Sequence, residues 1–131
     1  MITGLDWCPV TDKIISCSID RNAYVWISDG KGKWKPTLAA LRISKGASCV
    51  AWNNNGTKFT AGSSNGSIIV GHFEAENDWW LCKHLKVNTE NTITSIAWHP
   101  NGIDIVAGSI DGTVIVTSGY IKNVDQKYVN Y

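Results

Sequence analysis

The serine-containing segment 62–66, Gly-Ser-Ser-Asn-Gly, has the residue types and spacing of a nucleophile elbow. In that G-x-S-x-G motif, a serine on a sharp turn between a strand and a helix attacks an acyl group. The same segment recurs along the chain at 17–21 and at 108–112. We therefore interpret it as the tight turn of a repeated hairpin, and we predict no catalytic serine.

The other candidates for reactive chemistry lack the spacing that the chemistry requires. The run 30–33 (Gly-Lys-Gly-Lys) does not follow the G-x-x-x-x-G-K-[ST] pattern of a phosphate-binding loop. Cys8, Cys17, Cys49 and Cys82 form no C-x-x-C pair, and the histidines add no zinc-ligand spacing. The sequence predicts no enzyme, no cofactor and no metal site, with free thiols typical of a reducing compartment.

These turns belong to a repeat that covers the chain. Trp7, Trp52 and Trp98 are 45 and 46 residues apart. Other residues keep the same offsets, namely the turn residues Asp20, Asn65 and Asp111 and the apolar residues Ile14, Phe59 and Ile105. A period of about 40–45 residues with short strands and Gly/Asp turns is typical of β-propeller blades. The repeat therefore predicts an all-β protein built from blades.

Each repeat is predicted to form one blade, a four-stranded antiparallel sheet. We expect these blades at 1–46, at 47–92 and, together with a tail, at 93–131. In the second repeat, period-two alternation and Asn/Gly turns predict four strands. They are expected at about 48–52, 58–62, 67–73 and 79–85.

Two positions of the repeat predict how the blades pack. Because tryptophan fills one position in every repeat, we expect Trp7, Trp52 and Trp98 to fill the space between neighbouring blades. A second position holds only small residues that fit near the propeller axis, namely Ser16, Ala61 and Ala107. Terminal repeats of a stack need polar caps, which the first and third blades lack. We therefore expect a marginally stable chain that self-associates.

Length and charge limit the function classes. With 131 residues and three blades, the chain is too short for a ring of four to eight blades. We expect a part of a longer propeller or a subunit that closes its ring by oligomerising. A net charge of +1 argues against nucleic-acid or membrane binding driven by bulk charge. We expect no signal peptide and no membrane insertion, since neither a leader pattern nor a membrane-length apolar run is present.

The outer strands of the blades carry aromatic residues beside basic ones. Such combinations are enriched at the energetic centres of protein interfaces. The partner-binding candidates are Arg21, Trp34, Lys35, Arg42, Trp79, Trp80 and Lys83. One aromatic of each outer strand has an alternative role, which is to pack beneath its own blade. A basic pocket near Arg21, Arg42 and Lys45 would instead favour a general propeller adaptor that binds peptides or phosphoproteins.

Several longer strings are more specific than the repeat. They include 20–26 (DRNAYVW), 34–38 (WKPTL), 41–43 (LRI), 76–80 (ENDWW), 82–84 (CKH), 98–101 (WHPN) and 120–122 (YIK). Together they resemble the WD-repeat (p41-type) subunit of the actin-related protein 2/3 complex, in register over nearly the whole chain. The general Trp-Asp dipeptide of WD repeats is absent. The tail 123–131 departs from the resemblance.

The resemblance implies a WD40-type β-propeller of seven blades, of which this chain holds about three. It also implies a non-catalytic scaffold subunit that supports actin filament nucleation and branching in the cytoplasmic actin cytoskeleton. Its expected partners are the other complex subunits, actin and nucleation-promoting factors. The general WD-repeat adaptor stays the alternative.

Overall fold

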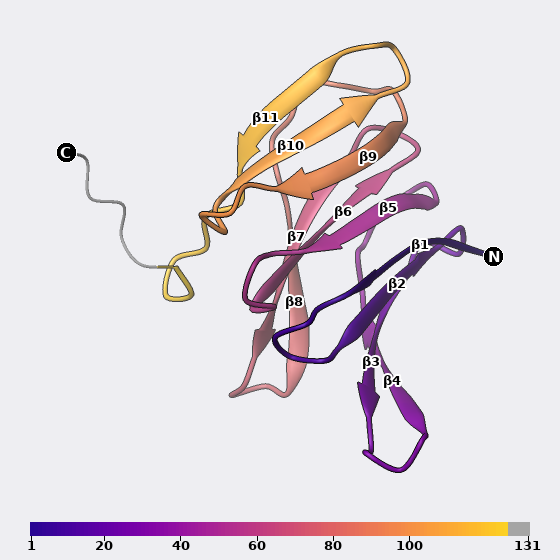
Figure 1. The fold of residues 1–131 in the computed structure, drawn as a ribbon. Coiled ribbons are helices and arrows are strands. Elements are labelled where there is room, and N and C mark those ends of the chain that lie inside the picture. Colours follow the sequence, from indigo (N-terminus) through magenta and orange to yellow (C-terminus); the bar gives the residue numbers. More distant parts are fainter. Residues whose placement is uncertain (126–131) are drawn as a thin grey trace.

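The computed structural model describes residues 1–125, which form eleven strands in three antiparallel sheets (Figure 1). The first sheet consists of β1 (Ile2–Trp7), β2 (Ile14–Ser18), β3 (Ala23–Ser28) and β4 (Trp34–Ala39). The second consists of β5 (Ala47–Trp52), β6 (Lys58–Ser63), β7 (Ile68–Glu74) and β8 (Trp79–His84). The third consists of β9 (Ile93–Trp98), β10 (Asp104–Ser109) and β11 (Val114–Ser118). The all-β prediction is confirmed, and the second repeat has its four strands within one residue of the expected bounds.

The turns explain why these strands are short. Gly66 in the β6–β7 turn and Gly112 in the β10–β11 turn have φ angles of 88° and 86°. Glycine adopts such values without steric cost, so each hairpin reverses within a few residues. Segment 62–66 is the β6–β7 turn, closed by a hydrogen bond from the Ser63 N–H to the Ser67 carbonyl at 3.0 Å. A strand follows it, so the segment is no nucleophile elbow.

The third sheet has three strands in the described range, where four were expected. After β11 the chain turns at Gly119, whose N–H donates to the Ile103 carbonyl at 2.6 Å. It then folds back at Ile121, whose carbonyl accepts from the Asp125 N–H at 2.9 Å. The Asp125 carboxylate contacts the Lys58 ammonium of β6 at 2.6 Å. These bonds hold segment 119–125 against the second sheet, so this segment does not pair with β11 as a fourth strand.

The three sheets stack face to face in chain order. Figure 1 shows the first sheet at the bottom and the third at the top, with β5 lying between β1 and β9. One apolar core fills the space between the first and second sheets, and it includes Ile15, Val25, Trp52 and Phe59. Two smaller clusters around Ile93 and Ile105 fill the space between the second and third sheets. Such burial supplies most of the stabilising free energy, at about 25 cal/mol per Å² of apolar surface.

The tryptophan position behaves differently in the three sheets. Trp52 is 6% exposed between the first and second sheets, as predicted. Trp98 also lies between sheets and donates from Nε1 to the Ala51 carbonyl at 3.0 Å. For Trp7 the prediction is wrong, because the side chain is 60% exposed. Within the described residues, nothing stacks on that side of the first sheet. The small residues Ser16, Ala61 and Ala107 are buried as expected.

Candidate protein interface

The partner-binding candidates lie in four places along the fold. Trp34 and Lys35 begin the outer strand β4, and Trp79, Trp80 and Lys83 lie on the outer strand β8. Arg21 lies in the turn between β2 and β3, and Arg42 follows β4. The structure therefore brings only some of them together.

The β8 strand separates its candidates by alternation. Trp80 is 6% exposed and packs inside the fold, with its ring centroid 5.7 Å from those of Trp52 and Phe59. It matches the alternative role of an aromatic that packs beneath its own blade. Trp79 is 47% exposed, and Lys83 is also exposed. Since strand side chains alternate, Trp79 and Lys83 lie on the other, exposed face of β8. That face therefore carries one aromatic and one cationic side chain.

The β4 strand separates its two candidates in the same way. Trp34 is half-buried and packs edge-to-face on Trp7, with ring centroids 5.9 Å apart. Lys35 is exposed and points to the opposite face of the strand. Trp34 thus belongs to the uncovered face of the first sheet, and Lys35 does not.

Arg42 lies where the outer strands of the first two sheets meet. The His84 Nε2 atom is 2.9 Å from the Leu41 carbonyl, which ties the end of β8 to the end of β4. Burial raises the pKa of the Cys82 thiol to about 12, and the Arg42 charge partly opposes this rise. Arg42 is exposed and, with Lys83, gives this junction a positive charge.

Arg21 occupies a strained position. Its φ angle is 75°, and the second and third repeats place Gly66 and Gly112 there. A residue with a Cβ atom in this left-handed region costs roughly 1–2 kcal/mol. The Arg21 side chain is exposed.

Two polar residues that sequence reasoning missed join the sheets. The Asp6 carboxylate accepts from the Trp52 backbone N–H at 2.7 Å, across the space between the first and second sheets. The Lys58 side chain is fully buried, with its Nζ 2.9 Å from the Gly119 carbonyl and 4.9 Å from the centre of the Trp98 ring. Nothing in the pattern marks Lys58 as buried, because its partners are 61 and 67 residues away along the chain.

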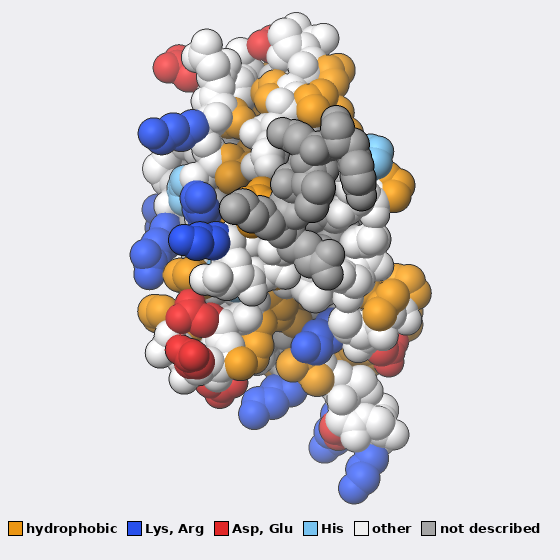
Figure 2. Space-filling model, turned by 90° about the vertical axis from the view of Figure 1, so that its left-hand side faces the viewer, with side chains coloured by type: hydrophobic (Ala, Val, Ile, Leu, Met, Phe, Trp, Pro, Cys, Tyr) orange, Lys and Arg blue, Asp and Glu red, His pale blue; other side chains and the backbone are white. Residues whose placement is uncertain are grey.

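Charge is distributed unevenly on the surface. Figure 2 shows Lys and Arg side chains gathered along one edge of the molecule, next to a group of acidic side chains. The four cysteines are free thiols. Among residues 1–125, no group of three or more His, Cys, Asp or Glu side chains is placed to hold a metal ion. No helix of that same range is long and apolar enough to cross a membrane.

The chain is similar to known proteins over almost its whole length. The WD domain, G-beta repeat family model matches residues 1–26, 38–70 and 79–118. Actin-related protein 2/3 complex subunit 1A-B of Xenopus laevis is 50% identical over 126 residues, which are 96% of this chain and 34% of that protein. Subunit 1 of the same complex from Schizosaccharomyces pombe is 45% identical over 97% of this chain and 34% of that protein. Subunit 1A from Arabidopsis thaliana is 40% identical over 97% of this chain and 33% of that protein.

The chain thus spans about a third of the length of the curated relatives it matches. The resemblance to the WD-repeat subunit of the actin-related protein 2/3 complex is confirmed, and so is the WD40 fold class.

Proposed function

The chain belongs to the WD domain, G-beta repeat family, and from this premise we propose that it acts as a non-catalytic scaffold subunit of an actin-related protein 2/3 complex. In this role it supports actin filament nucleation and branching in the cytoplasmic actin cytoskeleton. Its partners are the other subunits, actin and nucleation-promoting factors. The segments 1–46 and 47–92 each contribute one blade, and 93–131 contributes a blade and a tail.

One observation carries this proposal. Relatives from a frog, a yeast and a plant share 40–50% of their residues with this chain over at least 96% of it, and all are named as subunit 1 of this complex. A general adaptor needs only the repeat pattern of turns and core residues. The strings 76–80 (ENDWW) and 82–84 (CKH), on which the resemblance to that subunit depends, lie on or beside the outer strand β8 and so extend beyond that pattern.

The geometry supports binding at the outer strands. Trp79 offers a large apolar side chain, Lys83 offers a cation on the same face, and Arg42 adds charge at the junction of the first two sheets. Exposed aromatics near cations are typical binding anchors. Pro36 on the exposed strand β4 lacks a backbone donor, which discourages unspecific pairing of that edge. The surface thus favours side-chain recognition over strand addition.

The test is affinity purification of the tagged chain from a cell extract, followed by mass spectrometry. We expect recovery of actin-related proteins and companion subunits. The double variant Trp79→Ala, Lys83→Glu should reduce that recovery at least tenfold. Lys31→Glu, which makes the same charge change in the β3–β4 hairpin, is the matched control and should leave recovery unchanged.

Two results would contradict the proposal. Absence of every complex subunit, from a chain shown to be folded by circular dichroism, would exclude the scaffold role. Recovery of phosphoproteins in place of complex subunits, lost on exchange of Arg21 and Arg42, would favour the adaptor alternative.

A further inference from the structure

Segment 119–125, which follows the third sheet, is held on the second sheet by a buried ion pair. The Lys58 side chain is fully buried, and its Nζ lies 2.6 Å from the Asp125 carboxylate and 2.9 Å from the Gly119 carbonyl. The same carboxylate oxygen of Asp125 accepts from the Ile121 backbone N–H at 2.7 Å. One lysine of β6 therefore binds both the start and the end of the segment.

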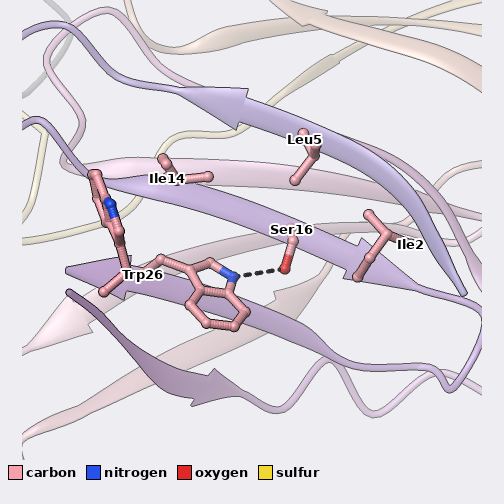
Figure 3. Close-up of a pocket in the computed structure, with 6 residues that line it drawn as sticks. Ile2, Leu5, Ile14, Ser16 and Trp26 are labelled. Carbon is pink, nitrogen blue, oxygen red and sulfur yellow. Dashed lines mark hydrogen bonds between the residues drawn. The ribbon is translucent and has the colours of Figure 1, made fainter. Parts of the chain in front are cut away.

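His72 lies beside this ion pair and has a buried ring nitrogen. His72 on β7 is the cross-strand partner of Lys58 on β6, so their side chains are neighbours on one face of the second sheet. The His72 Nδ1 atom is buried and makes no hydrogen bond within residues 1–125. By contrast, Trp26 Nε1 in the first sheet donates to Ser16 Oγ at 3.0 Å (Figure 3). A buried Nδ1 without a partner suits a neutral ring, because burying a charged ring costs far more free energy.

Segment 119–125 covers the part of the second sheet that carries His72. Ile121 is buried in an apolar cluster with Val70, which precedes His72 by two residues and lies on the same face of β7. Trp98 packs against the same cluster, and its ring centre is 4.9 Å from Lys58 Nζ. Release of the segment would therefore uncover the face on which His72 lies.

Both acidic and basic side chains surround the His72 ring. Glu74 lies on the same strand and accepts from Asn77 Nδ2 at 2.5 Å, and Lys83 of β8 lies on the same face of the sheet. The ion pair adds one charge of each sign. The titratable side chains of the segment, apart from the carboxylate of the ion pair, are Tyr120, which is half-buried, and Lys122, which is exposed.

These surroundings favour the neutral ring. Burial lowers the pKa of His72 from its ordinary value of 6.5. The charges of Glu74 and Asp125 partly oppose this change in pKa, and the charge of Lys58 adds to it. The attached segment thus binds a proton at His72 less readily than an exposed histidine would.

A proton on His72 conflicts with the ion pair in either of two ways. The Nδ1 atom becomes a donor, and Asp125 already accepts from both Lys58 and the Ile121 N–H. If Asp125 turns to His72, Lys58 loses its counter-charge in a buried place. If Asp125 stays, the protonated ring is buried without an acceptor. Each outcome weakens the attachment of segment 119–125.

We propose that His72 makes the attachment of segment 119–125 to the second sheet sensitive to acid. Neutral His72 permits the Lys58–Asp125 pair, and protonation of His72 favours release of the segment, which opens the ring to water. The released state takes up its proton near the ordinary pKa of 6.5, and the attached state does so only at lower pH. The attachment is therefore strongest above pH 6.5 and weakens as the pH falls through that value. This inference concerns the fold and does not depend on the proposed function.

The test is amide hydrogen exchange of the 131-residue chain, measured by NMR at about pH 7.5 and about pH 5.5, on either side of the ordinary histidine pKa. The reporting amides are those of Gly119 and Ile121, which donate to the Ile103 carbonyl and the Asp125 carboxylate. Their protection factors, corrected for the intrinsic effect of pH on exchange, should fall several-fold at the lower pH. The amides that pair β5 with β6 should keep their protection.

Two histidine variants assign the effect. His72→Gln keeps a polar side chain of similar size but does not titrate, so Gly119 and Ile121 should be equally protected at both pH values. His84→Gln is the matched control, because His84 lies on the opposite face of the second sheet and contacts the Leu41 carbonyl. It should keep the pH dependence of the wild-type chain.

Three results would overturn the proposal. The first is equal protection of segment 119–125 at both pH values in the wild-type chain. The second is a pH dependence that persists in His72→Gln, which would assign the effect to Asp125 or Glu74. The third needs no variant and applies even if His72→Gln does not fold. It is a His72 pKa at or above 6.5 in an NMR titration of the wild-type ring, because the attached segment would then favour the protonated form.

Discussion

The tryptophan position offers a matched test of how a neighbouring sheet stabilises the fold. Trp52 and Trp7 occupy the same place in successive repeats, but they are 6% and 60% exposed. Trp52→Ala and Trp7→Ala therefore remove the same atoms from a covered and from an uncovered sheet face.

The structure sets the expected magnitudes. Trp52 packs between Phe59 and Trp80, with centroid distances of 6.1 and 5.7 Å, and its indole donates across the sheets. Removing such a core aromatic costs about 3–5 kcal/mol. Trp7 buries less than half of its surface, and at about 25 cal/mol per Å² its loss should cost roughly 1–2 kcal/mol. We expect a difference of about 2 kcal/mol between the variants.

The assay is equilibrium unfolding in urea followed by circular dichroism, and each variant is compared by its own transition midpoint and slope. A lower midpoint with an unchanged slope reports lost stability. Equal losses for the two variants would refute the reasoning, because burial between sheets would then not decide the contribution of this position.

Three further predictions concern local features. Arg21→Gly should raise the free energy of unfolding by roughly 0.5–1 kcal/mol and Gly112→Arg should lower it similarly, because both positions have positive φ angles; a urea titration that gives the opposite signs would contradict the strain argument. Asp125→Asn should destabilise by about 3–5 kcal/mol, measured by thermal unfolding, because it leaves the Lys58 ammonium buried without its counter-charge; a loss under 1 kcal/mol would show that the pair is not buried. Burial raises the pKa of the Cys82 thiol from 9.0 to about 12, so the unfolded chain releases this proton first, and stability should fall as pH rises from 9 towards 12. In urea titrations, Cys82→Ala should reduce the loss of stability between pH 9 and 12. An unchanged dependence of stability on pH in this variant would contradict the role of the Cys82 thiol.

The repeat in the sequence made the local fold predictable. Strand bounds depend on alternation and turn chemistry, and both are short-range, so Trp52, Phe59 and the small residues Ser16, Ala61 and Ala107 could be placed in the core. The candidate interface was harder to predict from the sequence. Alternation separates Trp79 from Trp80, but only the stacking of sheets decides which of the two is covered.

The sequence by itself determined the blade period, the turns and the family, because these follow from neighbouring residues and from spacing along the chain. The tertiary structure alone decided which faces are covered. Trp7 and Trp52 are identical in local sequence role, and only the presence of an adjoining sheet distinguishes them. It also decided that Lys58 is buried beside Asp125, because a charge can be buried only where distant parts of the chain supply its counter-charge and acceptors.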